Sequence, residues 1–300
     1  MDLVIKNGIV VTAADVFRAD VGIVGEKIVA LGQELQGREE IDANGLYVFP
    51  GFIDAHVHLS LPAGELISSD DFTTGTIAAA CGGTTTVLAF VTPERGQSLH
   101  EAVCARRAEA DGRAATDYSL HLTAVDATER TRQELAELSV QGYTSLKLYT
   151  TYPAVMTNDE EMLLLLETCR QHRILPIVHT ENHAAIEYLK ARLLAAGYTD
   201  PTAHPRSRPP LVEAEAAQRV LTLAALTDCP MYIVHLTCLE TLAAVEQARA
   251  CGQRVYAEVC PQHLLLSEDN YARPDFEGAK YVLSPPLRDK SHWEALWRAL

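Results

Sequence analysis

The sequence has few basic residues and no long apolar run, and these two absences exclude whole classes of function. Lysine and arginine number 25 against 40 aspartates and glutamates, which gives a formal net charge of −15. Nucleic acids and anionic membranes are bound through lysine- and arginine-rich surfaces, so we expect neither as a partner. No apolar run approaches the roughly 20 residues that cross a bilayer, and the first residues carry no basic segment ahead of an apolar stretch. We therefore expect a cytoplasmic protein.

The cysteines lack the spacing of a metal site or a disulfide framework. They number seven, lie scattered along the chain and include no Cys-x-x-Cys pair, so we expect reduced, packed thiols. The rest of the composition is that of a globular protein, because 300 residues of which 48% are hydrophobic and 22% charged can bury a large core. One large domain with a small accessory unit is the expected organisation.

Residues 1–50 read as short strands and predict part of a small β-sandwich domain. The pair Asn7-Gly8 and the glycine at position 25 each separate two short apolar runs. Asn-Gly between apolar runs is a strong hairpin signal, because both turn positions need a positive φ. We therefore predict a hairpin at each of these two places.

From residue 51 onward, apolar strands alternate with helical stretches, which is the repeat of a parallel sheet. A capping box at residues 157–160 predicts a helix over 161–172, and Gly252 is expected to end a helix over 239–251. The pattern predicts an α/β fold, a TIM-like (β/α)8 barrel over residues 51–300 of which about seven strands are present. These predicted strands cover residues 52–58, 85–90, 119–125, 145–149, 175–179, 231–236 and 254–259.

A closed barrel of this kind needs an eighth strand. Seven strands would leave an open edge and a wet apolar interior, so we expect the chain to be a fragment that is truncated before strand eight. The alternative is an open doubly wound sheet, which needs no further strand.

Four histidines end three of the predicted strands. His56 and His58 lie two apart, so their imidazoles would share a face of the first barrel strand, and His179 and His235 each follow an apolar, β-branched run. Barrel active sites form where the carboxyl ends of the strands meet, and imidazoles that converge there suit Zn²⁺. Any one of these histidines could instead lie at the surface or be a core residue bonded to backbone. Their recurrence favours a metal site.

Lys147 is a cation inside the apolar strand 145–149. A desolvated ammonium is costly and would repel metal ions, so the side chain must either extend its charge to solvent or be chemically altered. Reaction with CO₂ would convert it to N6-carboxylysine, a carbamate whose carboxylate can bridge two divalent metals. Desolvation would favour this reaction by lowering the pKa of the amine.

These residues belong to motifs that identify a family. Across essentially all of its 300 residues the chain resembles the D-hydantoinase and dihydropyrimidinase group of the amidohydrolase superfamily. The motifs that carry the resemblance are Pro50-Gly51-Phe52-Ile53-Asp54-Ala55-His56-Val57-His58, Lys147-Leu148-Tyr149-Thr150-Thr151-Tyr152, Val178-His179-Thr180-Glu181-Asn182, Tyr232-Ile233-Val234-His235 and Ser284-Pro285-Pro286-Leu287-Arg288.

The resemblance implies a metal-dependent hydrolase that opens the ring amide of hydantoins or dihydropyrimidines. Two divalent ions are expected, zinc or alternatively manganese or cobalt, bridged by a hydroxide that attacks the amide carbon. Tyr152 would stabilise the oxyanion and bind substrate, and Ser284 would bind the ring amide through its backbone. His56, His58 and carboxylated Lys147 would hold one ion, and Lys147, His179 and His235 the other.

The resemblance also implies a homo-oligomer, a tetramer or a dimer. The family's proton-shuttling aspartate on strand eight would lie past Leu300, so we expect the 300-residue fragment itself to be inactive.

Three rival functions remain open. Dihydroorotases carry the motif His-x-His-x-Arg, in which the arginine binds the carboxylate of the substrate. This chain has Ser60 at the position of that arginine, which disfavours a carboxylated substrate. The apolar stretches 61–67 and 152–156 suit an uncharged ring with an apolar substituent, but allantoinase remains an alternative. Some relatives keep the fold and act as non-catalytic assembly proteins. The complete set of ligand positions favours an enzyme.

Overall fold

The computed structural model describes residues 1–63 and 66–300, which divide into two compact units. The first unit comprises Met1–Leu88 and Gly112–Tyr118, and the second comprises Ala89–Asp111 and Ser119–Leu300. The predicted apolar stretch 61–67 is described in part, because Gly64 and Glu65 lie outside the described residues. The domain boundary at residue 50 stays a prediction.

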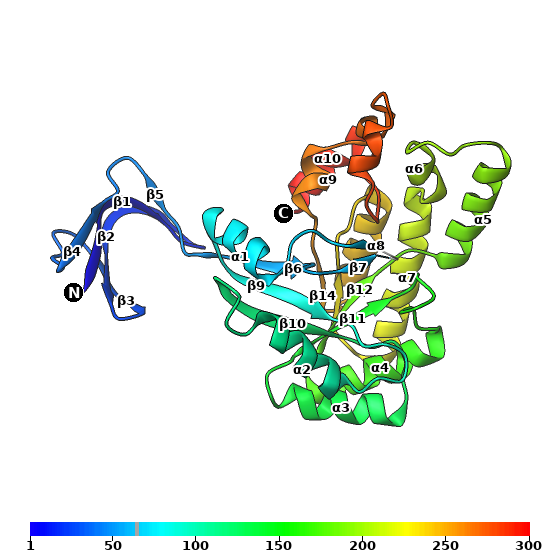
Figure 1. The fold of residues 1–300 in the computed structure, drawn as a ribbon, viewed down its shortest axis with the longest axis horizontal. Helices are drawn as coiled ribbons and strands as arrows, with labels where there is room; N and C mark the ends of the chain where they lie inside the picture. Colours follow the sequence, from blue (N-terminus) through cyan, green and yellow to red (C-terminus); the bar gives the residue numbers. More distant parts are fainter. Residues whose placement is uncertain (64–65) are drawn as a thin grey trace. The chain divides into compact units, whose positions relative to one another are not determined.

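The first unit begins with a mixed sheet whose strands are ordered β3-β2-β1-β4, with β5 also paired to β1 (Figure 1). Strands β1 and β2 and strands β2 and β3 are antiparallel, whereas β4 and β5 run parallel to β1. Val10, Ala19 and Val21 form its buried core. The bounds are β1 Leu3–Val11, β2 Val16–Val24, β3 Lys27–Gly32, β4 Glu39–Asp42 and β5 Tyr47–Val48.

One of the two predicted hairpins is confirmed and the other is wrong. Strands β2 and β3 pair around Gly25, whose φ is +58°. Residues 3–11, in contrast, form one continuous strand with a register shift between Ile5 and Gly8. The two-residue turn that Asn-Gly favours needs a positive φ at both residues, and of the pair only Asn7 has one, at 61°. The Asn-Gly signal therefore marks a β-bulge, in which the Asn7 backbone N–H donates to Asp20 Oδ1 at 2.8 Å.

The rest of the first unit holds the first predicted barrel strand. Strand β6 (Phe52–Val57) lies beside β9 (Thr84–Val91), and the Phe52 N–H donates to the carbonyl of Gly83. Helix α1 (Phe72–Cys81) is capped by Asp71, which accepts hydrogen bonds from the backbone of Thr73 and Thr74. Strands β7 (Pro62–Ala63) and β8 (Leu66–Ile67) pair antiparallel.

The second unit continues from the end of β9 through parallel strands in the order β9-β10-β11-β12-β13-β14. With β6, all seven predicted strands are present among the described residues, and each of the last four is followed by a helix, which confirms the α/β fold. Strands β13 and β14 are three residues each, shorter than predicted. The bounds are β10 Asp117–Thr123, β11 Ser145–Tyr149, β12 Leu175–His179, β13 Met231–Ile233 and β14 Val255–Ala257.

The helices of the second unit follow the order of the strands. Helix α2 packs on α3, α3 on α4, α4 on α7 and α7 on α8, while α4, α7 and α8 cover β12, β13 and β14 (Figure 1). The predicted capping box is confirmed one residue later than expected, with Asn158 bonded to the backbone of Glu161. The bounds are α2 Leu99–Ala110, α3 Glu129–Ser139, α4 Asp159–His172, α5 His183–Ala195, α6 Ala203–Ser207, α7 Pro210–Thr227, α8 Leu239–Ala250, α9 Pro261–Leu265, η1 Glu268–Ala272, η2 Glu277–Tyr281, η3 Lys290–His292 and α10 Trp293–Ala299.

Strand register places Lys147 and His179 on the same face of the sheet. Lys147 pairs with Ile177 and Tyr149 pairs with His179, so alternate residues of β11 and β12 share a face. Phe90, Ile177 and Val234 form a buried cluster on the same unit. In the described part of the chain, no helix is long and apolar enough to cross a membrane.

Candidate functional site

His56 and His58 lie together at the carboxyl end of β6 in the first unit. Their ring centroids are 5.3 Å apart with an interplanar angle of 65°, as expected for side chains two apart on a strand. The His56 backbone N–H donates to Asp54 Oδ1 at 3.1 Å, so Asp54 holds the backbone of the motif. The two imidazoles are near enough to share a cation.

Lys147 lies in the middle of β11 in the second unit and is only 1% exposed. Its Nζ lies 5.2 Å from the ring centroid of Phe90 and 5.1 Å from that of Tyr149. Burial lowers the pKa of the amine to about 7, against the opposing charges of Glu258 and Cys260. Near neutral pH a large share of the side chain is therefore an uncharged, nucleophilic amine.

His179 and His235 contact each other beside this lysine strand. Their ring centroids are 4.5 Å apart at 72°, and both side chains are buried. His179 ends β12, whereas His235 lies two residues past β13 with a φ of 40°. The backbone N–H of His235 donates to Glu258 Oε1 at 3.2 Å. Burial lowers the pKa of His179 despite its hydrogen bond to Glu181. The ring is therefore neutral near pH 7, which is the form that binds a metal ion.

Glu181 and Arg208 adjoin His179, and the site residues inferred from the sequence do not include them. Glu181 is fully buried, and its Oε2 lies 2.7 Å from His179 Nε2 and 2.6 Å from Arg208 Nη1. Burial opposes ionisation of Glu181, but its hydrogen bonds with His179 and Arg208 and the charge of Arg208 outweigh it, so the pKa of the carboxyl is lowered. The signal for Glu181 was its place two residues after His179, whereas Arg208 comes from an irregular segment with no pattern.

Thr150 joins the ends of β11 and β12. Its hydroxyl Oγ1 lies 3.0 Å from the carbonyl oxygen of His179 and 2.9 Å from that of Glu181, and it accepts from the Glu181 N–H at 2.9 Å. This buried threonine therefore fixes the backbone that carries both His179 and its carboxylate partner.

Tyr152 lies beside His179, whereas Ser284 lies on the segment that follows η2. The rings of Tyr152 and His179 are 5.2 Å apart, and the Arg208 guanidinium carbon lies 5.7 Å from the Tyr152 centroid. Burial raises the pKa of Tyr152 and the charge of Glu181 adds to this, so its hydroxyl stays protonated and can donate. Ser284 Oγ lies 3.5 Å from His204 Nε2.

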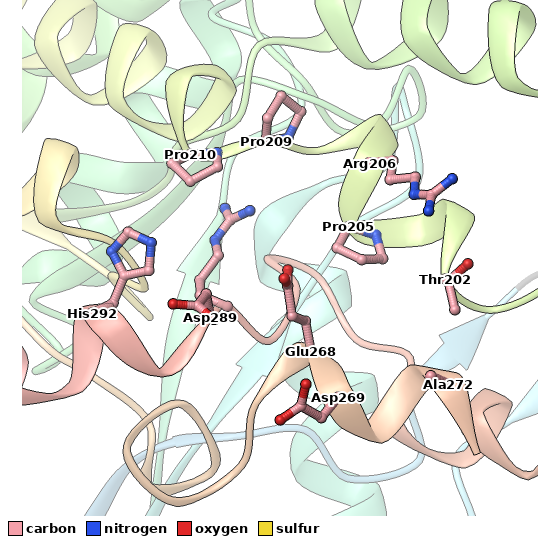
Figure 2. Close-up of a pocket in the computed structure, with 11 residues that line it drawn as sticks. Thr202, Pro205, Arg206, Pro209, Pro210, Glu268, Asp269, Ala272, Asp289 and His292 are labelled. Atoms are coloured by element: carbon pink, nitrogen blue, oxygen red, sulfur yellow. The ribbon is translucent and has the colours of Figure 1, made fainter.

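A separate cavity of about 440 Å³ lies between the α6–α7 segment and the last helical turns (Figure 2). Thr202, Pro209, Glu268 and His292 are among its lining residues, and Arg288 forms part of its wall. None of the site residues predicted from the sequence lines it. The cavity is therefore distinct from the cluster around His179.

Among residues 1–63 and 66–300, no three His, Cys, Asp or Glu side chains converge closely enough to hold a metal ion by themselves. Within the second unit the predicted donors are two histidines and a lysine. A lysine becomes a metal ligand only when it is neutral or carboxylated, and the lowered pKa of Lys147 meets that condition.

A family model described as the amidohydrolase family matches residues 47–279. The chain belongs to the amidohydrolase family. It is 45% identical over 302 residues to the D-hydantoinase of Ralstonia pickettii, across 100% of this chain and 66% of the relative. The family membership agrees with the resemblance seen in the sequence motifs.

Solved structures give the same assignment. The dihydropyrimidinase from Brevibacillus agri NCHU1002 superposes with a TM-score of 0.97 at 44% identity, across 100% of this chain and 66% of that chain. The L-hydantoinase (dihydropyrimidinase) from Arthrobacter aurescens gives a TM-score of 0.86 at 25% identity, across 99% and 66%. The chain thus spans 66% of the length of the relatives it matches here.

Proposed function

We propose that the protein hydrolyses the ring amide of hydantoins or dihydropyrimidines in a metal-dependent reaction. Lys147 carries the proposal, because an amine with a pKa of about 7, buried within an amidohydrolase strand, is suited to react with CO₂. The relatives' names, D-hydantoinase and dihydropyrimidinase, support this substrate class. We extend the proposal to a cytoplasmic homo-oligomer, a tetramer or a dimer.

The proposed metal ligands are His56 and His58 from the first unit and Lys147, His179 and His235 from the second. The neutral amine of Lys147 would attack CO₂ and release a proton, which leaves a carbamate in place of a cation. This exchange removes the electrostatic objection to a lysine among metal ligands. When bound, the divalent ions, with zinc the first candidate, would supply a hydroxide at neutral pH and polarise the amide carbonyl.

The other residues of the site have roles that follow from their surroundings. The protonated hydroxyl of Tyr152 would donate a hydrogen bond to the oxygen that gains negative charge. The backbone of Ser284 would bind the ring amide and orient it. Ser60 leaves this part of the chain without the arginine that would select a carboxylated ring, so an uncharged ring is the proposed substrate.

The handedness of the relatives indicates which enantiomer to test first. Two D-hydantoinases are 45% identical to this chain, whereas the L-hydantoinase structure is 25% identical. One relative is named D-phenylhydantoinase, so a phenyl-substituted hydantoin is a suitable probe. We propose the D-enantiomer of such a ring as the better substrate.

The decisive experiment measures metal content and carbamate together. The protein would be purified in bicarbonate and analysed for metals, for a ¹³C-carbamate signal and for ring opening of dihydrouracil and phenylhydantoin. We expect two metals, one carbamate and hydrolysis. Lys147→Ala should lose the carbamate and both metals and lower kcat/KM by at least about a thousandfold.

Two outcomes would count against the proposal. Unchanged metal occupancy in Lys147→Ala would show that the lysine holds no cation. Metal without hydrolysis of any cyclic amide would favour a non-catalytic assembly protein, and a preference for carboxylated rings would favour dihydroorotase. Lys190→Ala, which removes an exposed lysine paired with Glu187, is the matched control and should change nothing.

A further inference from the structure

We propose that Glu181 is a positioning residue for His179: it holds Nε2–H of the imidazole so that Nδ1 is the nitrogen that faces a metal ion. Arg208 completes the device by keeping Glu181 ionised. The inference rests on the proposed function, because it assigns a role to a neighbour of a proposed ligand.

The side chains of Glu181 and His179 form a short hydrogen bond that is buried from solvent. Glu181 Oε2 and His179 Nε2 are 2.7 Å apart, and the exposed fractions of the two side chains are 0% and 4%. Water therefore does not compete for this hydrogen bond, and both groups lie on one short segment of backbone. The hydroxyl of Thr150 fixes that segment, because its single proton lies within reach of the carbonyls of both residues and its oxygen accepts from the Glu181 N–H.

The chemistry of the pair determines the tautomer. An ionised carboxylate only accepts hydrogen bonds, so the nitrogen that contacts it must carry the proton. A neutral imidazole has a single N–H, and placing it on Nε2 leaves the lone pair on Nδ1. A metal binds the nitrogen with the lone pair, so Glu181 decides which side of the ring does so. Carboxylate–histidine pairs behind a metal commonly orient the ring in this way.

Arg208 explains why a fully buried carboxylate can remain charged. Its Nη1 donates to Glu181 Oε2 at 2.6 Å, so the buried pair carries no net charge. The backbone of Arg208 is fixed by Arg288, whose guanidinium donates to the carbonyl of Arg208. The guanidinium also lies over the ring of Tyr152, at 5.7 Å from the centroid. One arginine thus contacts both the carboxylate and the proposed oxyanion donor.

The first test reads the tautomer directly in the metal-free protein. Labelling histidine with ¹⁵N distinguishes a protonated Nε2 from a protonated Nδ1 by nuclear magnetic resonance, and the His179 signals are identified by their loss in His179→Ala. We expect His179 as the Nε2–H tautomer with a downfield proton. A His179 ring protonated on Nδ1 would overturn the proposal, and this measurement needs no variant of Glu181.

The second test measures metal affinity in variants. Glu181→Gln keeps a similar shape but removes the charge, and we expect Co²⁺ to bind one of the two positions about 10- to 100-fold more weakly, with a changed visible spectrum. Glu213→Gln is the matched control. Glu213 is also buried, at 1% exposed, and also pairs with an arginine, Arg288, but does not contact His179. Glu213→Gln should lower the free energy of unfolding but bind Co²⁺ with the same affinity as the parent protein.

The outcomes separate this inference from the proposed function. If the parent binds two Co²⁺ ions and Glu181→Gln binds them with the same affinity, the role of Glu181 is refuted while the metal centre stands. If the parent binds no cation, both are refuted. If Glu213→Gln weakens binding as much as Glu181→Gln, the effect reflects general loss of stability and the positioning role is refuted.

Discussion

The two compact units carry their proposed metal donors in different surroundings. In the first unit, His56 and His58 lie at a strand end that is half-buried to exposed, and the backbone N–H of His56 is bonded to the Asp54 side chain. In the second unit, Lys147, His179 and His235 are buried. Glu181, paired with Arg208, contacts the ring of His179, and Glu258 accepts from the backbone N–H of His235.

This difference shows two ways of positioning metal-binding side chains: by the repeat of a single strand, or by contacts with other buried side chains. In the first unit the two-residue repeat of a strand is enough to bring two rings to 5.3 Å. In the second unit the donors come from separate strands, so their positions depend on buried side chains drawn from distant parts of the chain. The second unit should therefore be far more sensitive to loss of a single charge.

The largest expected effect is on stability in the second unit. Arg288 is 4% exposed and donates to Glu213 Oε2 at 2.9 Å, so Arg288→Met leaves an unpaired buried carboxylate and should cost about 3 to 5 kcal/mol. Lys6 of the first unit is half-buried and pairs with the exposed Glu40 at 3.7 Å, and Lys6→Met should cost at most about 1 kcal/mol. Urea unfolding measures both, and equal losses would contradict the comparison.

A comparable effect is expected on catalysis. Tyr152→Phe removes the hydroxyl proposed to donate to the oxyanion, so kcat should fall about 10²- to 10³-fold with little change in KM or metal content. Steady-state kinetics of the protein measure this change. The control Tyr188→Phe alters an exposed tyrosine of α5 and should keep full activity. A fall in metal content of Tyr152→Phe would assign the residue a structural role instead.

Strand positions and the histidines that end them were predictable because they depend on local pattern. Apolar, β-branched runs predicted β11 and β12 to the residue, and the alternation of side chains predicted that His56 and His58 share a face. The bulge at Asn7 was mistaken for a hairpin, because the sequence does not show that only one residue takes a positive φ. Arg208 was not predictable, since its contact with Glu181 joins residues 27 apart through an irregular segment.

Two buried histidines of the second unit should also make the protein sensitive to acid. Burial lowers the pKa of His204, and likewise of His263, although each ring has a backbone carbonyl as a hydrogen-bond partner. Because the folded pKa lies below the unfolded value of about 6.5, the unfolded chain binds more protons as pH falls. Stability is thus fully present above about pH 6.5 and is lost below it, by about 1.4 kcal/mol for each unit of depression.

Urea midpoints at pH 7.5 and pH 5.5 test this expectation. His263→Phe removes one of the two rings and should reduce the loss between the two pH values, whereas His172→Phe, which alters an exposed ring at the end of α4, should leave the loss unchanged. An identical pH response in His263→Phe and the parent would refute the assignment.

The smallest effect is expected in the first unit. Asp54→Ala removes one acceptor for the His56 N–H, which should cost about 0.5 to 1.5 kcal/mol. Because Asp54 accepts from the backbone of His56, whereas Glu181 contacts an imidazole nitrogen of His179, metal affinity should fall far less than in Glu181→Gln. Titration with Co²⁺ compares the two variants, and equal losses would show that both units need a carboxylate to hold their histidines.

Thr150 coordinates nothing in this scheme, yet its hydroxyl couples two strand ends. It bonds to the peptide groups on either side of Thr180, so displacement of β11 carries the backbone of His179 with it. Valine has the same shape without the hydroxyl, so Thr150→Val would preserve the packing and release that coupling. The spacing between two proposed metal ligands on different strands is thus maintained by a residue that a search for ligands would pass over.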